Sequence, residues 1–503
     1  MSSKNNFYFK LQALHKEVTG SCILCTIHFP NNHERNILVD CGIYQEQTYE
    51  DLNNEFKFNI KNIDAVILTH SHIDHIGRVP YLSKLGYNGP VYCNALTRNL
   101  FGVLLYDCAK KFQKDFEKEK RTVKNPTPPL YNYDDVDKAI SLIKTKRINE
   151  PFEIDDGITI TFIDNGHMLS ASSIYIEASY KNRKKINLLF SGDYKKENLF
   201  KETSVIPQSI AENKNLNLVI ESTLFESYQN SPATFKDDII SQLKQEKPIL
   251  ILSLAQERLE TILYNLKEIE SCGHDFEIWI DAPLGISILD IYRKNSNINF
   301  MPKNVNVVVS QEEREILLKN PKKGRIIITS SGMADGGNAP YYLETYLRCN
   351  SAIFFTSYLS NNSLGRKVVE TSRGNKIRVF PFGEQIKINA QIFQTREFSS
   401  HGSPEEILDF IKSFSSLKNV FINHGSEKSQ KILKNTLGNM DIKSTILGNE
   451  EIHKVTNLGD VYSTLIHPPK KEIKNTYNRP SKYSNLENRT IPASRRKKSC
   501  INY

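Results

Sequence analysis

The sequence predicts an α/β protein that contains two kinds of sheet. Toward both ends of the chain, short apolar strands finish on Asp, His or Glu, as expected where one edge of a β-sandwich carries a site. Between about residues 230 and 385, helices alternate with short apolar strands, which indicates a parallel sheet. A chain of 503 residues is also too long for one core, so we expect at least two domains.

Composition narrows the class of protein. The chain is 39% hydrophobic and 24% charged, which is ordinary for a globular protein that buries a core. No apolar run approaches the ~20 residues that span a membrane, and the first residues lack the apolar core of an export signal. The eight cysteines are scattered and form neither a disulfide framework nor paired zinc knuckles. We therefore expect a cytoplasmic protein with no membrane partner.

Most of the net charge of +9 falls at the end of the chain. Residues 466–503 hold ten Lys or Arg against two Glu, whereas the rest of the sequence is close to neutral. This segment is poor in apolar residues and contains several Pro, Ser and Asn, so we expect a disordered basic tail. A tail of this kind attracts polyanions or only keeps the chain soluble, and both roles fit the composition.

Alternating and β-branched residues predict the first strands at 7–9, 11–14, 20–27 and 37–40. Asp40 ends the last of these strands and is followed by Cys41 and Gly42. An acid at a strand end can orient a neighbouring metal ligand. It is also a common turn residue, so Asp40 taken alone fits either role.

The next apolar run, 65–68, leads into the segment Thr69-His70-Ser71-His72-Ile73-Asp74-His75. Neutral imidazole and carboxylate are both good ligands for zinc or manganese. Four such groups within six positions are too crowded for one ion, which predicts two metals that share one loop. The alternative is an exposed polar loop, but the whole chain has only 12 histidines, so this clustering is not expected by chance.

After a charged helix expected at 91–124, three further strands each deliver a candidate ligand. The strand at 158–163 precedes His167, the strand at 186–190 precedes Asp193, and the strand at 216–220 precedes Glu221. His167 offers a third imidazole for one metal. Asp193 is suited to bridge two cations, because a carboxylate has two oxygens and reduces the repulsion between the ions.

The middle of the chain carries one glycine-rich segment, 330–337, directly after an apolar strand expected at 324–329. The backbone amides at Ser331 and Gly332 are candidates to cradle a phosphate, and a plain tight turn is the alternative. Farther on, a strand expected at 386–393 leads to His401. A helix at 404–414 and a strand at 419–423 then lead to His424.

These residues resemble a known family. The ordered set Asp40, His70-x-His72-x-Asp74-His75, His167 and Asp193 resembles the four motifs of the metallo-β-lactamase fold. The segments Glu221-Ser-Thr, Phe398-Ser-Ser-His401 and Phe421-Ile-Asn-His424-Gly resemble motifs A, B and C of its nucleic-acid-processing branch, the β-CASP nucleases. The resemblance covers residues 10 to 460. Within the family, the chain resembles prokaryotic relatives of the endonuclease subunit of the eukaryotic mRNA 3′-end cleavage complex.

The resemblance implies an αββα sandwich built from residues 1–225 and 386–465, with a β-CASP domain of residues 226–385 inserted between them. It also implies two zinc ions per chain, with manganese as an alternative metal. The implied ligands are His70, His72 and His167 for one ion and Asp74, His75 and His424 for the other, with Asp193 bridging them and Asp40 bracing the ligands.

The implied activity is that of a binuclear ribonuclease acting on single-stranded RNA. A metal-bridging hydroxide attacks the phosphodiester in line, which leaves a 5′-phosphate and a 3′-hydroxyl. Asp74 belongs to the catalytic centre, and His401, oriented by Glu221, protonates the leaving oxygen as general acid. RNA is preferred over DNA because motif C carries His424, where the DNA-repair branch typically has valine.

This chain departs from the family pattern at four places. Residues 255–258, Ala-Gln-Glu-Arg, stand where a Gly-Arg pair is usual, Leu224 and Phe225 follow motif A, Gly402-Ser403 follows His401, and Ser426 follows Gly425 where Glu is usual. Three other functions remain open: a DNA nuclease of the same fold, a catalytically silent RNA-binding scaffold, and a hydrolase of small esters or thioesters. A scaffold usually has eroded ligands, and an esterase has no need of the inserted domain. The sequence leaves open endonuclease or exonuclease action and a homodimer.

Overall fold

The computed structural model describes residues 7–466 except 182–183, 204, 227, 229–232, 381–382 and 449–450. The predicted basic tail therefore lies outside the described residues, apart from Ile466. None of the described helices is long and apolar enough to cross a membrane.

The first sheet takes strands from both ends of the described chain. Its eight strands run in the order β23-β22-β1-β2-β3-β4-β5-β6. β22 pairs antiparallel with β1, so that Phe9 lies opposite Val455. The strands are β1 (Tyr8–Ala13), β2 (Ile23–His28), β3 (Glu34–Val39), β4 (Ala65–Ile67), β5 (Val91–Cys93), β6 (Ile143–Thr145), β22 (Glu451–Thr456) and β23 (Val461–Leu465).

The second sheet has seven strands in the order β21-β20-β11-β10-β9-β8-β7. β10, β11 and β20 are parallel, and β8 runs in the same direction because it is separated from β10 by the antiparallel β9. Their carboxyl ends therefore lie at one edge of the sheet. The strands are β7 (Phe152–Asp155), β8 (Ile158–Asp164), β9 (Ser172–Tyr180), β10 (Lys184–Phe190), β11 (Leu216–Ile220), β20 (Leu417–Ile422) and β21 (Ser444–Ile446).

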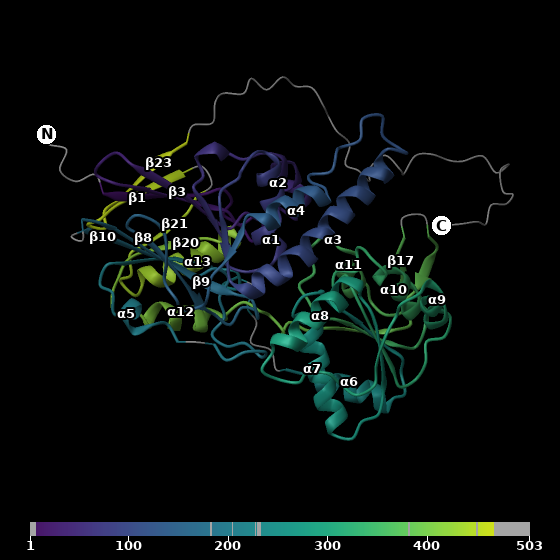
Figure 1. Ribbon diagram of the computed structural model, residues 1–503. Coiled ribbons are helices and arrows are strands. Elements are labelled where there is room, and N and C mark those ends of the chain that lie inside the picture. The colour runs from purple at the N-terminus through teal and green to yellow at the C-terminus, as the bar shows by residue number, and fades with distance from the viewer. Residues whose placement is uncertain are drawn as a thin grey trace. The chain divides into compact units, whose positions relative to one another are not determined.

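The two sheets pack face to face and are covered by helices on their outer faces (Figure 1). Phe9 and Ile27 of the first sheet share a buried cluster with Phe162, Ile176 and Leu188 of the second. This arrangement confirms the expected αββα sandwich. Its helices are α1 (Ile73–Ile76), α2 (Val79–Lys84), α3 (Ala95–Glu119) and α4 (Tyr133–Ser141), then α5 (Gln208–Ala211), α12 (Pro404–Lys412) and α13 (Glu427–Gly438), with 3₁₀ turns at Gln47–Asn54 and Ile60–Asn62.

The middle of the chain forms a separate parallel sheet of six strands, ordered β14-β13-β15-β12-β16-β19, as the alternating pattern predicts. Its strands are β12 (Ile249–Leu252), β13 (Glu277–Asp281), β14 (Val305–Val307), β15 (Arg325–Thr329), β16 (Ala352–Phe355) and β19 (Gln391–Gln394). The helices beside it are α6 (Phe235–Lys244), α7 (Arg258–Ser271), α8 (Pro283–Asn295), α9 (Gln311–Lys319), α10 (Ala339–Arg348) and α11 (Leu364–Glu370).

Two expected elements differ from the structure because strand pairing outweighs local pattern. The expected helix at 91–124 begins as strand β5, which pairs with β4 and β6 before α3 starts at Ala95. The expected strand at 386–393 is divided between β18 (Gln385–Lys387), which pairs with β17 (Lys376–Arg378), and β19. Because β19 pairs with β16, the inserted sheet extends past residue 385.

Arg78, at the start of α2, ties together the chain segments behind the histidine-rich loop. It is among the largest fully buried side chains, and its Nε donates to the carbonyl of Gly42 at 2.6 Å. Its Nη1 donates to the carbonyls of Leu52 and Glu55, and the guanidinium lies over the rings of Tyr44 and Phe56 at 4.7 and 4.8 Å. A planar donor with five N–H groups suits this task better than lysine does.

We expect Arg78→Met to lower the free energy of unfolding by about 2–4 kcal/mol, because three carbonyls lose their donor. Urea denaturation followed by circular dichroism measures this change. Arg293→Met is the matched control, since Arg293 pairs with Asp290 on the exposed surface of α8 and should contribute less than about 1 kcal/mol. Equal losses in the two variants would contradict the role of Arg78.

Candidate metal centre

The candidate ligands all follow the carboxyl ends of strands. His70 follows β4, His167 follows β8, Asp193 follows β10 and His424 follows β20. Parallel strands place these ends at a common edge, so residues up to 354 positions apart in the sequence reach one site. The structure brings together every metal ligand that the sequence analysis proposed, in two neighbouring groups.

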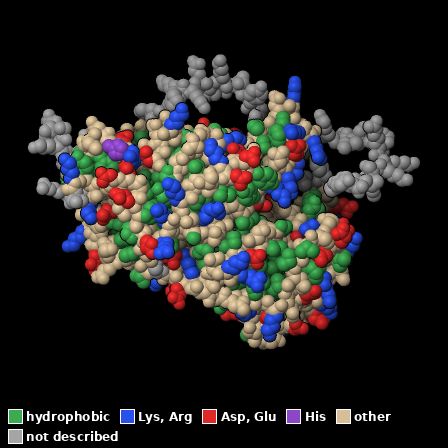
Figure 2. Space-filling model, in the orientation of Figure 1, with side chains coloured by type: hydrophobic (Ala, Val, Ile, Leu, Met, Phe, Trp, Pro, Cys, Tyr) green, Lys and Arg blue, Asp and Glu red, His purple; other side chains and the backbone are tan. Residues whose placement is uncertain are grey.

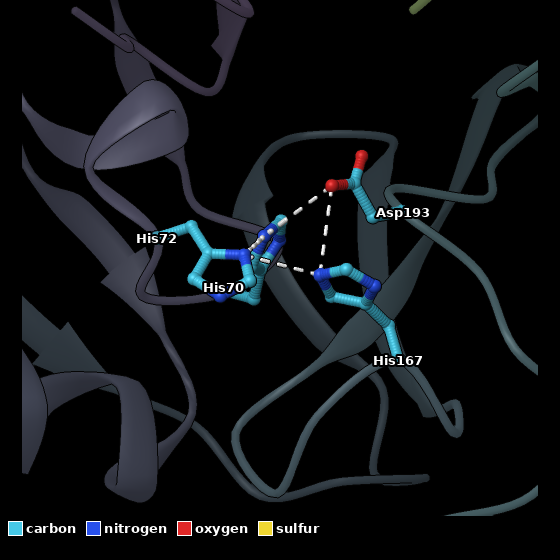
Figure 3. A group of neighbouring side chains, drawn as sticks. All are labelled: His70, His72, His167 and Asp193. Atoms are coloured by element: carbon cyan, nitrogen blue, oxygen red, sulfur yellow. Dashed lines mark hydrogen bonds and ion pairs between the residues drawn. The ribbon is translucent and has the colours of Figure 1, made fainter. Parts of the chain in front are cut away.

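The first cluster contains His70, His72, His167 and Asp193, whose ligand atoms lie within 4.8 Å of one another (Figure 3). His72 Nδ1 lies 3.1 Å from both His70 Nε2 and His167 Nε2. Asp193 Oδ2 lies 3.7 Å from His70 Nε2 and 3.5 Å from His167 Nε2. Three imidazole nitrogens and one carboxylate oxygen therefore point at one position.

The second cluster contains Asp74, His75 and His424. Asp193 turns its other oxygen toward it: Oδ1 lies 3.3 Å from His75 Nε2 and 3.3 Å from His424 Nδ1. The carboxylate of Asp193 thus contacts both clusters, one with each oxygen. This is the arrangement expected of a bridging ligand.

The buried polar atoms of the site fit a divalent cation. Within the described part of the chain, His75 Nε2, His424 Nε2 and Asp193 Oδ1 are buried without a hydrogen-bond partner. Buried polar groups normally have partners, and three unpartnered ones in one place are unfavourable unless a ligand engages them. Imidazole nitrogen with carboxylate oxygen is the donor set of zinc and manganese sites.

Asp40 orients the second cluster. Its Oδ1 accepts from the backbone N–H of Thr69, while its Oδ2 accepts from the Thr69 hydroxyl and lies 2.7 Å from His75 Nδ1. A proton held on Nδ1 leaves Nε2 of His75 free to bind a cation. His167 is arranged in the same way: its Nδ1 lies 3.0 Å from the carbonyl of Ser400, and its Nε2 belongs to the first cluster.

Burial favours neutral imidazoles in the first cluster, while the carboxylates around His75 place negative charge between the two clusters. Burial lowers the pKa of His70 and His167 well below the ordinary value, and it lowers the pKa of His72 to about 4. Neutral imidazole is the form that binds metal. Burial opposes the charge of His75 too, but Asp193, Asp40 and Asp74 outweigh it and raise its pKa. The same carboxylates attract a divalent cation.

A third group, His401 with Glu221, lies beside the metal clusters. His401 Nδ1 is 2.9 Å from Glu221 Oε2 and 3.0 Å from Oε1, and His401 Nε2 is 3.9 Å from Asp193 Oδ2. Burial disfavours the charge of His401, but Glu221 and Asp193 outweigh it and raise the pKa of His401 to about 9. These two carboxylates therefore favour the protonated imidazole, and its Nε2 faces the clusters.

Three family descriptions match successive parts of the chain. The metallo-β-lactamase superfamily matches residues 18–164 and the β-CASP domain matches residues 258–368. The Zn-dependent metallo-hydrolase RNA specificity domain matches residues 385–447. The chain belongs to the β-CASP branch of the metallo-β-lactamase superfamily.

Curated relatives match most of the chain. Transcription termination factor FttA of Lokiarchaeum is 28% identical over 455 residues, which cover 84% of this chain and 68% of the relative. Ribonuclease TTHA0252 of Thermus thermophilus is 26% identical over 82% of this chain and 92% of the relative. Probable RNase MJ4 of Methanocaldococcus jannaschii is 28% identical over 83% of this chain and 93% of the relative.

The β-CASP domain contacts the loops that carry the first cluster, which the sequence analysis did not foresee. Just before α7, the Gln256 side chain donates to the Ser71 hydroxyl at 2.5 Å, between His70 and His72. Gln256 belongs to the segment 255–258 that departs from the usual Gly-Arg, so the sequence indicated this position but not its contact with Ser71.

Glu257 extends this contact to the loop of His167. One oxygen accepts from the backbone N–H of Leu169 at 2.8 Å and from the Tyr292 hydroxyl at 2.6 Å. The other accepts from the Asn198 amide, which also donates to the carbonyl of Gly166. Glu257 thus holds Leu169 directly and Gly166 through Asn198, on either side of His167.

The glycine-rich segment lies at the carboxyl edge of the parallel sheet, after β15. A Cβ atom on Gly332 would lie 2.4 Å from Ser357 Oγ and 3.2 Å from the Leu254 nitrogen, so the backbone approaches two neighbouring loops closely. Among the described residues, neither Ser331 nor Gly332 has a hydrogen bond or ion pair with a residue of the metal clusters. Phosphate binding there stays a prediction.

Gly42 permits the approach that positions Asp74. A Cβ atom on Gly42 would lie 1.5 Å from the backbone oxygen of Asp74. We expect Gly42→Ala to displace the loop of Asp74 and His75 and to lower the metal content measured by elemental analysis by about half or more. Gly438→Ala is the control, because no atom lies within 4 Å of its added Cβ. Full metal content in Gly42→Ala would contradict this geometry.

Proposed function

We propose that this protein is a metal-dependent ribonuclease that hydrolyses phosphodiester bonds of single-stranded RNA. The observation that carries the proposal is the Asp193 carboxylate, which contacts two ligand clusters while His401 stands 3.9 Å from the same carboxylate. A double cation site with an adjacent proton donor suits the hydrolysis of a phosphodiester. Two relatives named as ribonucleases and the RNA specificity match support RNA as the substrate.

We propose that two zinc ions, or manganese in their place, occupy the site. His70, His72 and His167 would hold one ion, Asp74, His75 and His424 would hold the other, and Asp193 would contact both. When bound, the two cations lower the pKa of a water and neutralise negative charge on the phosphate. The buried nitrogens and oxygen that have no partner in the described chain support this assignment.

In the proposed reaction, His401 acts on the leaving group. A water that has lost a proton to solvent attacks as hydroxide, and the bond from phosphorus to the 3′ oxygen breaks as the hydroxide oxygen bonds to phosphorus. His401 gives its proton to the departing 3′ oxygen, which leaves a 3′-hydroxyl and a 5′-phosphate. Glu221 positions the ring, because its carboxylate engages Nδ1 and leaves Nε2 as the atom that faces the site.

We propose that RNA binds between the sandwich and the β-CASP domain. The sandwich comprises residues 1–225 and 386–465, and the β-CASP domain comprises residues 226–385 together with β18 and β19. Two observations support this placement. The segment from β19 to His401 is only six residues long, from 395 to 400, and the start of α7 contacts both loops of the first cluster.

The role of His401 has a direct test. We expect His401→Ala to keep both metal ions and to lose about 10²- to 10⁴-fold in turnover, since a general acid contributes on that order. Single-turnover cleavage of labelled RNA gives the rate, and elemental analysis gives the metal content. Loss of metal on this substitution would show that His401 is a ligand instead.

The substrate class is tested with matched strands. We expect the purified protein to cut an end-labelled single-stranded RNA and to leave the DNA of the same sequence intact, while Asp74→Ala cuts neither because the second cluster loses a ligand. The fragment ladder also separates endonuclease from exonuclease action. Cleavage of DNA alone would make the protein a DNA nuclease, and binding of RNA without cleavage at full metal content would make it a scaffold.

A further inference from the structure

Each residue of the segment 398–401 contacts a side chain at or beside the metal site. The carbonyl of Ser400 accepts from His167 Nδ1, and His401 itself is held by Glu221. The two residues before them, Phe398 and Ser399, are contacted by two cationic side chains instead. These cations play no part in the metal clusters or in the pair of His401 with Glu221.

Lys195 and Arg258 are the two cations. Lys195 lies two residues after the bridging Asp193, and its Nζ donates to the carbonyl of Ser399 at 2.7 Å. Arg258 is the first residue of α7, and its guanidinium lies 5.7 Å from the centre of the Phe398 ring. One cation comes from the sandwich and the other from the β-CASP domain, and both contact the segment leading to His401.

Neither cation is paired with a carboxylate. Within the described part of the chain, no Asp or Glu oxygen lies within 4.0 Å of Lys195 Nζ or of the Arg258 guanidinium. Glu257 is adjacent to Arg258 in the sequence, but its oxygens already accept from Leu169, Asn198 and Tyr292. Two other half-buried cations do have carboxylate partners: Lys201 pairs with Asp164 and Arg314 with Asp281.

A half-buried charge without a counter-ion keeps part of its desolvation cost uncompensated, and a bound anion offsets that cost. Both side chains are only partly covered, so a ligand can reach them. Burial lowers the pKa of Lys195 and lowers that of Arg258 to about 10, so Arg258 keeps its charge at neutral pH. On the face shown in Figure 2, basic and acidic side chains are interspersed, so no broad basic patch on that face supplies the anion contacts instead.

We propose that Lys195 and Arg258 together bind a backbone phosphate of the RNA substrate, the one next to the phosphodiester that is cut. This inference rests on the proposed ribonuclease function and adds to it a subsite in this chain. Lysine supplies a point charge and arginine a fork of donors, and both recognise phosphate oxygens. The phosphate is the missing counter-ion of the two cations and fixes the strand relative to His401.

The test removes the charges and keeps the internal hydrogen bonds. Glutamine at position 195 still donates to the Ser399 carbonyl, and glutamine at position 258 still donates to the Thr356 carbonyl, which Arg258 contacts at 2.6 Å. Binding of a fluorescent single-stranded RNA is followed by anisotropy at increasing salt, with metal-loaded His401→Ala protein so that the strand stays intact.

We expect Lys195→Gln and Arg258→Gln each to weaken RNA binding about tenfold at low salt. The slope of log K against log salt should fall by about 0.7 for each lost phosphate contact. Lys195→Arg and Arg258→Lys should retain most of the affinity, because they keep the charge. Lys323→Gln is the matched control: Lys323 pairs with Glu246 just before β15, at the opposite end of the parallel sheet, and should leave the slope unchanged.

A series of RNA strands, each with a single methylphosphonate at a different linkage, locates the phosphate that the two cations contact. We expect the effect of Lys195→Gln to vanish only when the phosphate beside the cut is neutral. Two results would overturn the subsite and leave the proposed function standing. One is an equal effect of Lys195→Gln at every linkage. The other is a salt slope in the Gln variants equal to that of the His401→Ala parent, while the wild-type protein still cuts RNA. Altered slopes in a protein that never cuts RNA would support the subsite and overturn the ribonuclease. A wild-type protein that does not bind RNA overturns both.

Discussion

The Asp193 carboxylate is the group on which the organisation of the site depends. One oxygen faces the cluster of His70, His72 and His167, and the other faces His75 and His424. A carboxylate shared in this way keeps two cations close and offsets their mutual repulsion, which a set of neutral imidazoles does not do. Asp40 supports the arrangement by fixing the ring of His75, so that a nitrogen faces the shared carboxylate.

Sheet topology delivers these groups to one place. β8, β10, β11 and β20 run in the same direction, so the residues that follow them meet at one edge of the second sheet. The loop after β4 meets them from the first sheet. Buried apolar faces hold the two sheets together behind this edge, and the polar site is therefore carried on rigid strands with only short loops between a strand and its ligand.

The β-CASP domain also supports the metal site, in addition to any role in binding substrate. Gln256 contacts the loop of His70 and His72, and Glu257 holds the loop of His167. The next residue, Arg258, contacts the segment that leads to His401. Three adjacent residues at the start of one helix thus couple the inserted domain to the first cluster and to the proposed general acid, so displacement of that domain disturbs both.

The sequence by itself determined the local parts of this protein. The spacing of His70, His72, Asp74 and His75 predicts a two-metal loop, because four ligands in six positions are a short-range constraint that survives in any fold. The alternation of helices and strands predicts the parallel sheet, because it too is a short-range pattern. The tertiary structure alone decided which distant groups share a carboxylate, that Val91–Cys93 is a strand and that Gln391–Gln394 joins the inserted sheet. It also decided that Lys195 and Arg258 contact adjacent residues, Ser399 and Phe398. These outcomes depend on strand order and domain packing between residues far apart in the chain, which no local pattern encodes.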